Sequence, residues 1–299
     1  MSKINQSLLL VFVLVLLGNG IILERIHRQK HLFLYFIDIG QGDASLLQYS
    51  GKNILIDGGD RPAGKSRVKS GLTAFLSSQG VRKIDLMILS HPHADHLGGL
   101  VEVMKRLPVD MILQSPGGHN TLLYRQFMEI ARRRNIRMIK ALRGMIISCG
   151  ETDKIMSMEI LSPDQNFQDK DLDNQSVVLR ITHLKHKILF TGDIRIPMET
   201  RLIALDKKKL QADILKIPHH GSKTSSGLVF LKTVHPQIAV ISCGKNNKYG
   251  FPHAEAINRI RKNCLLLHRT DEDGTLKILF LPERFVLTPH YTKKWWRPE

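Results

Sequence analysis

The chain has 299 residues, of which 42% are hydrophobic, and its formal net charge is +17. This length allows one sizeable domain, and the three scattered cysteines (Cys149, Cys243, Cys264) exclude a disulfide-stapled framework. So basic a surface attracts polyanions such as nucleic acid, anionic lipid or envelope polymers. The same charge also fits a source organism whose proteins are generally basic for solubility.

The first patterned segment, residues 8–23, is almost wholly apolar. As a helix it would be ~24 Å long, slightly short of the ~30 Å hydrocarbon core of a bilayer. No small-residue cleavage motif follows it, so we expect residues 1–30 to hold an uncleaved membrane anchor rather than a removed signal peptide or a core helix. Basic residues after it favour a cytoplasmic body, whereas a signal anchor would place the body outside, so orientation stays open.

Residues 31–288 are expected to form one domain of short strands and helices, followed by a basic tail, 289–299, whose tryptophans could stack on bases, sit at a membrane interface or simply fray. The expected strands are 32–37, 44–49, 52–56, 84–89, 155–161, 177–182, 187–190, 214–217, 238–242, 265–268, 275–281 and 285–287. The expected helices are 71–79, 97–106, 121–134 (with Asn120 as N-cap), 225–234 and 254–262. Two packed sheets with helices outside are the natural architecture for this order.

Four metal-binding side chains follow the apolar strand 84–89 within six residues: His91, His93, Asp95 and His96. They are expected on a strand-to-helix loop, where His91 and His93 share one side of an extended backbone. Asp95 and His96 lie past the bend and can face a second position. The string therefore predicts two neighbouring metal ions; a polar loop that only caps a helix would not need Asp95.

Two later strand ends carry further candidates. Asp193 is a candidate bridging carboxylate, because a shared anion lowers the repulsion between two cations. Of the adjacent His219 and His220, one can bind metal while the other hydrogen-bonds or donates a proton. Lys223 and the Ser222 hydroxyl suit phosphate, although this cluster also suits a helix N-cap. We assign catalytic roles to Asp95, His219 and Lys223.

Several polar loop residues are weaker candidates for orienting ligands or touching substrate. They are Asp38, Asp43 and Asp57 in glycine-containing loops, Asn174 before the strand 177–182, and Asn247 and Tyr249 in a late loop. Asp-Gly pairs alone are ordinary turn chemistry.

Over about residues 32–282 the chain resembles the metallo-β-lactamase superfamily, through the His91–His96 string, Asp57 and Asp193. Within it, the chain resembles the hydrolase domain of ComEC-type bacterial DNA-uptake channels. The matching stretches are 38–43, 55–59, 90–100, 190–193, 215–226, 241–252 and 269–275. ComEC carries this domain on a multi-span channel and this chain has at most one span, so the resemblance implies a stand-alone relative.

The resemblance implies an αββα sandwich and a two-metal phosphodiesterase acting on DNA, linked to DNA uptake in a bacterium, with Zn or Mn as cofactor. Metal one would be bound by His91, His93 and Asp193. Metal two would be bound by Asp95, His96, Asp193 and one of His219 and His220. Asp57 would orient the metal ligands without binding metal itself.

Two departures from the resembled pattern affect the site. Many relatives carry histidine as a third metal-one ligand, where this stretch offers Asn174. A late Tyr-Gly-His-Pro motif has Phe251 in place of its histidine, so His253 would substitute or the function is lost. Two other activities stay open: hydrolysis of an envelope polymer or lipid headgroup, as in a related choline-phosphate esterase domain, and non-catalytic DNA binding at a membrane.

Overall fold

A computed structural model of the chain describes residues 30–61, 71–150, 155–165 and 169–290. The expected anchor at 8–23 and the two tryptophans of the tail lie outside these residues. Among the residues described, no helix combines the length and the apolar character needed to cross a membrane.

Within the described ranges, fifteen strands form two sheets. The first sheet has the order β15-β14-β1-β2-β3-β4-β5-β6, with β1 (Leu32–Phe36), β2 (Ser45–Tyr49), β3 (Lys52–Ile56), β4 (Leu86–Leu89), β5 (Met111–Gln114), β6 (Arg137–Lys140), β14 (Thr275–Phe280) and β15 (Phe285–His290). The second has the order β13-β12-β11-β10-β9-β8-β7, with β7 (Ile146–Cys149), β8 (Met156–Ser162), β9 (Val178–His183), β10 (His186–Phe190), β11 (Ile214–Lys216), β12 (Ile238–Ile241) and β13 (Leu266–Arg269).

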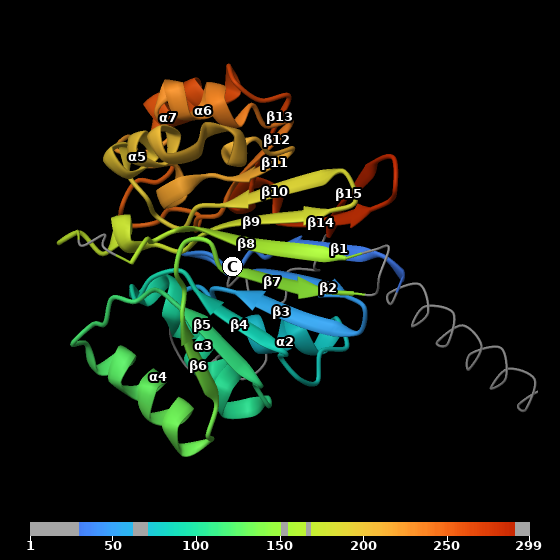
Figure 1. Ribbon diagram of the computed structural model, residues 1–299, viewed down its shortest axis with the longest axis vertical. Helices are drawn as coiled ribbons and strands as arrows, with labels where there is room; N and C mark the ends of the chain where they lie inside the picture. Colours follow the sequence, from blue (N-terminus) through green and yellow to red (C-terminus); the bar gives the residue numbers. More distant parts are fainter. Residues whose placement is uncertain (1–29, 62–70, 151–154, 166–168, 291–299) are drawn as a thin grey trace, which may run out of the picture.

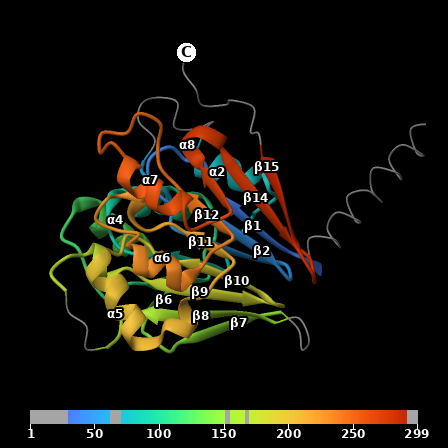
Figure 2. The same ribbon diagram turned by 90° about the horizontal axis from the view of Figure 1, so that it is seen from above.

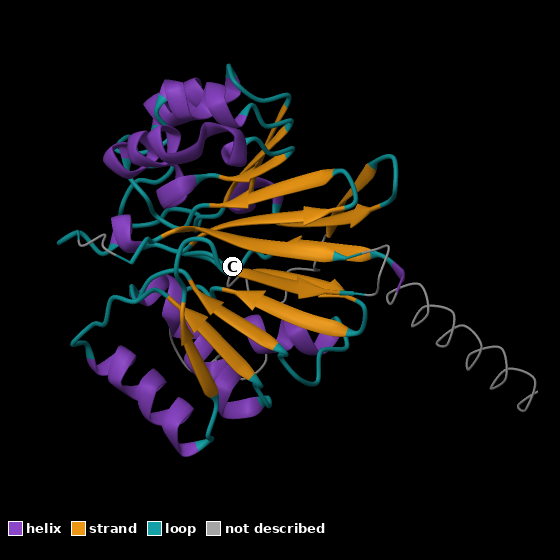
Figure 3. Ribbon diagram, viewed as in Figure 1, coloured by secondary structure: helices purple, strands orange, loops and turns teal. Residues whose placement is uncertain are grey.

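Helices cover the outer face of each sheet, which gives the expected αββα sandwich (Figure 1; Figure 3). The helices are α2 (Leu72–Ser78), α3 (Ala94–Arg106), α4 (Leu122–Arg133), α5 (Ile196–Asp206), α6 (Leu228–Val234), α7 (Ala254–Arg261) and the short α8 (Thr270–Asp273). One apolar cluster lies between the sheets, a second under α2, α3 and α4, and a third under α5, α6 and α7. Figure 2, seen from above, shows α5, α6 and α7 lying over the second sheet.

The sequence missed three strands, β5, β6 and β7, and two helices, α5 and the short α8. Strands β6 and β7 are the edge strands of their sheets and are only half-buried, so they lack the continuous apolar run that marks a buried strand. The N-cap of α4 is Thr121, whose hydroxyl accepts from the Tyr124 amide at 3.3 Å, rather than Asn120. Capping one residue later satisfies the same free helix amides.

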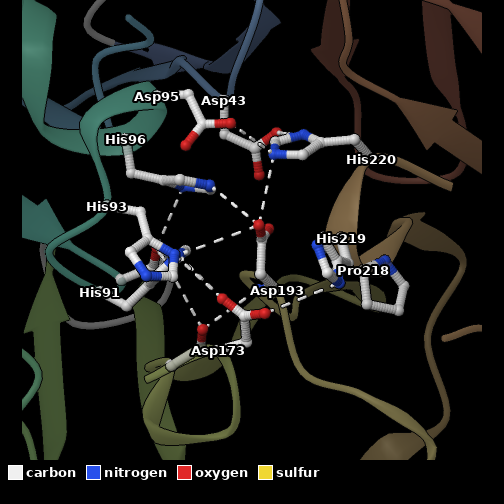
Figure 4. Close-up of polar contacts among 12 residues, drawn as sticks. Asp43, His91, His93, Asp95, His96, Asp173, Asp193, Pro218, His219 and His220 are labelled. Atoms are coloured by element: carbon white, nitrogen blue, oxygen red, sulfur yellow. Dashed lines mark hydrogen bonds and ion pairs between the residues drawn. The ribbon is translucent and has the colours of Figure 1, made fainter. Parts of the chain in front are cut away.

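The parallel strands explain how the fold gathers distant residues. Strands β3, β4 and β5 run parallel in the first sheet, and β10, β11 and β12 run parallel in the second. Carboxyl ends of parallel strands meet at one edge of a sheet, where open α/β sheets place their ligands. The loops after β4, β10 and β11 therefore bring His91, Asp193 and His220 to one place (Figure 4).

Candidate metal centre

The histidine string runs from the loop after β4 into the start of α3, because the helix begins three residues earlier than the predicted 97. Helix α3 begins at Ala94, with His93 as N-cap, so Asp95 and His96 lie in its first turn. His91 and His96 are completely buried, whereas the His93 side chain is 39% exposed. The string thus lines a site that extends from the interior to the surface.

One group of donor atoms, the metal-one set, contains His91, His93 and Asp173. His93 Nδ1 lies 3.0 Å from His91 Nε2 and 3.0 Å from Asp173 Oδ1, and His91 Nε2 lies 3.7 Å from the same oxygen. Two imidazole nitrogens and a carboxylate oxygen directed at one space are donors that divalent transition metals accept.

Asp173, rather than Asn174, is the residue that faces His91 and His93. The Asn174 side chain donates to Asp169 Oδ2 at 2.9 Å and accepts from the Arg195 amide at 3.0 Å, so it ties the loop to α5. The two residues share a 3-10 turn, whose geometry a sequence pattern does not specify. The residue that faces the two histidines is therefore one position before Asn174, and it brings a carboxylate where an amide was expected.

A second group, the metal-two set, contains Asp95, His96 and His220. His220 Nε2 lies 3.3 Å from Asp95 Oδ2. The rings of His96 and His220 are 5.2 Å apart. Of the two adjacent histidines, His220 is therefore the one that joins the metal-two set.

Asp193 lies between the two sets, as a bridging carboxylate must (Figure 4). Its Oδ2 lies 3.9 Å from His91 Nε2 and 3.3 Å from both His96 Nε2 and His220 Nε2. The preceding Gly192 has φ +51°, and a Cβ there would lie 2.7 Å from Ser176 Cβ, so glycine allows this close turn.

Four buried atoms of the two sets and of Asp193 make no hydrogen bond within the described part of the chain: Asp173 Oδ1, His96 Nε2, His220 Nε2 and Asp193 Oδ1. Buried polar atoms are nearly always paired, so converging unpaired donors of this kind fit a metal ion. The residues present therefore fit two divalent metals, which would be held by the metal-one set and the metal-two set with Asp193 between them.

The electrostatics of the cluster also favour bound cations. Burial opposes the charged form of His96, yet Asp193 and Asp57 outweigh it and hold the pKa of His96 well above its ordinary value. His91 behaves differently, because burial and the neighbouring His96 lower its pKa to about 3. A pocket that stabilises positive charge while keeping one histidine neutral suits metal ligation.

Partners behind the ligands fix their ring orientation. Asp57 Oδ2 lies 2.9 Å from His96 Nδ1, a contact that fits the role predicted for Asp57. His220 Nδ1 lies 2.8 Å from the Ser242 carbonyl oxygen, and His91 Nδ1 lies within 3.3 Å of the Ser176 hydroxyl. In each case the other ring nitrogen faces the donor cluster, the arrangement that metal-binding histidines usually have.

The loop after β1 closes against the histidine string. Gly42 has φ +105°, and a Cβ there would lie 1.8 Å from the Asp95 backbone oxygen, so only glycine fits. Gln41 Nε2 donates to Asp95 Oδ2 at 3.2 Å. Sequence reasoning singled out the aspartates of this loop but missed Gln41, whose proximity to Asp95 only the packed loops reveal.

His219 lies beside the site, with its side chain 15% exposed, and belongs to neither set. Its Nδ1 is 3.9 Å from Asp173 Oδ2, and its ring centroid is 5.3 Å from that of Phe251. Both His219 and His220 have positive φ, near +50°, a strained conformation that functional sites can retain. This turn directs the neighbouring rings to different places (Figure 4).

The remaining candidates lie around the site rather than in either set. Ser222 bonds the Thr224 hydroxyl at 2.9 Å, and the side chain of Asn247 bonds its own loop. Asp38 Oδ1 accepts from the Gly40 amide at 3.3 Å. Lys223 is exposed, and Tyr249 is 46% exposed.

Phe251 fills the place where the resembled motif has histidine. Its ring centroid lies 5.9 Å from that of His220. The expected substitute, His253, accepts from the Lys223 amide at 3.0 Å and belongs to neither set. The metal-two set nevertheless contains both of its histidines, so the change to Phe251 leaves the ligands intact.

Replacing Asp173 with histidine is expected to shift metal preference from Mn towards Zn by about tenfold or more, because imidazole suits Zn whereas carboxylate suits Mn. Dialysis against equal Zn and Mn followed by elemental analysis measures this ratio. Asp171→His is the matched control, since Asp171 also pairs with Arg195, at 3.0 Å, but belongs to neither set. An unchanged ratio of Zn to Mn in Asp173→His would show that Asp173 does not bind metal.

Comparison with known proteins agrees with this geometry. Residues 37–142 match the metallo-beta-lactamase superfamily. ComE operon protein 3 of Bacillus subtilis is 28% identical over 81% of this chain and 32% of its own length. Competence protein ComA of Neisseria gonorrhoeae is 32% identical over 80% of this chain and 31% of its own length. The chain thus spans about a third of the length of these curated relatives.

Among solved structures, a metallo hydrolase from Ignicoccus hospitalis has the same fold. It superposes with a TM-score of 0.51 at 15% identity, over 86% of this chain and 98% of that protein. At this identity the likeness supports the fold alone.

Proposed function

This chain contains a metallo-β-lactamase superfamily domain, and from that premise we propose that it is a two-metal phosphodiesterase that cleaves DNA in a process linked to DNA uptake. The observation that carries the proposal is Asp193 Oδ2, which lies within 3.9 Å of ligand nitrogens from both metal sets. Two ions sharing one carboxylate form the arrangement that clamps the attacking and leaving oxygens of a phosphodiester.

Two divalent cations in these sets would supply water activation and charge stabilisation on the phosphate. The chain's own residues then have separate tasks. Asp95, held by Gln41, keeps a fixed anion on one side of the metal-two set. His219, which lies beside the site, would donate a hydrogen bond from its N–H to the leaving oxygen. Lys223, exposed beyond His219, attracts the next phosphate of the strand.

Charge and relatives support DNA as the substrate. The net charge of +17 draws in a polyanion. One relative, ComA of Neisseria gonorrhoeae, is a competence protein by name, which supports a link to DNA uptake. The mixed imidazole and carboxylate ligands suit Mn or Zn, and the carboxylate of Asp173 favours Mn. We further propose that residues 8–23 tether the domain to a membrane.

The test uses the purified full-length chain, stripped of metal and incubated with end-labelled single- or double-stranded DNA plus Mn or Zn. We expect cleavage with added metal and none with chelator. Hydrolysis of a small phosphodiester without any DNA cleavage would contradict the DNA proposal and indicate an envelope or lipid substrate. Salt-sensitive DNA binding without turnover would contradict catalysis altogether.

A further inference from the structure

Lys216, the last residue of β11, is a buried cation next to the metal-two set. Its side chain is 2% exposed, and its Nζ lies 2.6 Å from Asp43 Oδ2. The same ammonium donates to the Ile217 carbonyl at 2.8 Å. Because Asp43 follows β1 in the first sheet and Lys216 ends β11 in the second, this ion pair joins the two sheets at the site.

Asp43 is close enough to the site to compete for metal. Its Oδ1 lies 3.1 Å from His220 Nδ1 and makes no hydrogen bond among the described residues. Donor atoms of Asp43, Asp193 and His220 all lie within 4.8 Å of one another. Lys216 pairs with Asp43 Oδ2, and Asp43 Oδ1 contacts His220 at Nδ1 rather than at Nε2, the nitrogen that faces Asp95 and Asp193.

The carboxylates of the pocket are offset by different cations. The donor clusters of the described residues contain five carboxylates, namely Asp43, Asp57, Asp95, Asp173 and Asp193. Buried charges are costly unless they are paired. Arg195, 38% exposed, pairs with Asp173 on the metal-one side. On the metal-two side, the buried ammonium of Lys216 pairs with Asp43.

We propose that Lys216 is a positioning residue for metal two: it neutralises Asp43 and keeps that carboxylate out of the coordination shell, so that Asp95, His96 and His220 bind the ion. The proposal rests on the two-metal site proposed above. In this role Lys216 neither binds metal nor touches substrate. It determines which carboxylates are free to bind the metal.

The experiment measures Mn affinity by equilibrium dialysis and elemental analysis on the full-length chain, with folding checked by circular dichroism. Lys216→Met is expected to weaken binding of the second ion by ~10–100-fold, the range for residues that support metal ligands. Asp43→Asn is also expected to weaken it, because Lys216 then faces the ion as an unpaired cation. The double variant should bind the second ion more tightly than either single variant, since neither charge is left unpaired.

Lys209→Met is the matched control, because Lys209 pairs with Glu159 away from the donor clusters and should leave Mn binding unchanged. Wild-type affinity in Lys216→Met, or a double variant no better than the singles, would overturn the proposal. If Lys216→Met does not fold, the Mn affinity of Asp43→Asn compared with that of the double variant still tests the proposal. A wild-type chain that binds no Mn would instead refute the proposed two-metal function.

Discussion

Asp193→Asn is expected to release metal from both sets and to lower DNA hydrolysis by more than ~100-fold. Residues that only support a ligand already account for ~10–100-fold in metal affinity or activity. Asp193 should exceed that range, because its Oδ2 lies within 3.9 Å of nitrogens from His91, His96 and His220. Asparagine keeps the shape of the side chain but removes the anion that offsets repulsion between the two ions.

Elemental analysis of the purified variant measures the lost metal, and a DNA cleavage time course measures the lost activity. Asp110→Asn is the matched control, because the Asp110 side chain is 53% exposed and pairs with Lys83 outside the cluster. A variant that kept two ions and wild-type turnover would show that Asp193 does not bridge them.

Substitution of the two adjacent histidines is expected to separate metal binding from proton transfer. His220→Ala should reduce metal content to about one ion and abolish hydrolysis, because His220 Nε2 faces Asp95 and Asp193 at 3.3 Å. His219→Ala should keep both ions and lower turnover by ~10²–10⁴-fold, the range for a lost general acid or base. Each variant serves as the control for the other.

Metal content and turnover measured on the same preparations distinguish the two roles. Loss of one ion in His219→Ala with none lost in His220→Ala would reverse the assignment. Full activity in His219→Ala would contradict a role of His219 in proton transfer. Its packing against Phe251, with ring centroids 5.3 Å apart, would then be a structural contact.

Many residues of this site could be predicted from the local sequence. The string from His91 to His96 predicted two metals, because extended backbone before a helix start separates His91 and His93 from Asp95 and His96. Strand-end chemistry also identified Asp193 and Asp57 as candidates. These residues are recognisable because ligands lie at strand ends, and strands that are buried have a clear apolar pattern.

The tertiary structure corrected the residues whose roles depend on long-range packing. Asp173, rather than Asn174, faces His93, because both residues lie in a 3-10 turn that directs the Asp173 carboxylate towards it. The sequence also missed the edge strands β6 and β7, which are half-buried and lack an apolar run.

By itself the sequence determined the kind of site: an αββα fold with histidines and aspartates clustered at strand ends. Only the tertiary structure decided that His220 rather than His219 lies in a donor cluster, that Asp173 joins His91 and His93, and that Lys216 pairs with Asp43. The physical reason is distance along the chain. Asp43 and Lys216 come from different sheets, and their 2.6 Å contact exists only once the sheets pack.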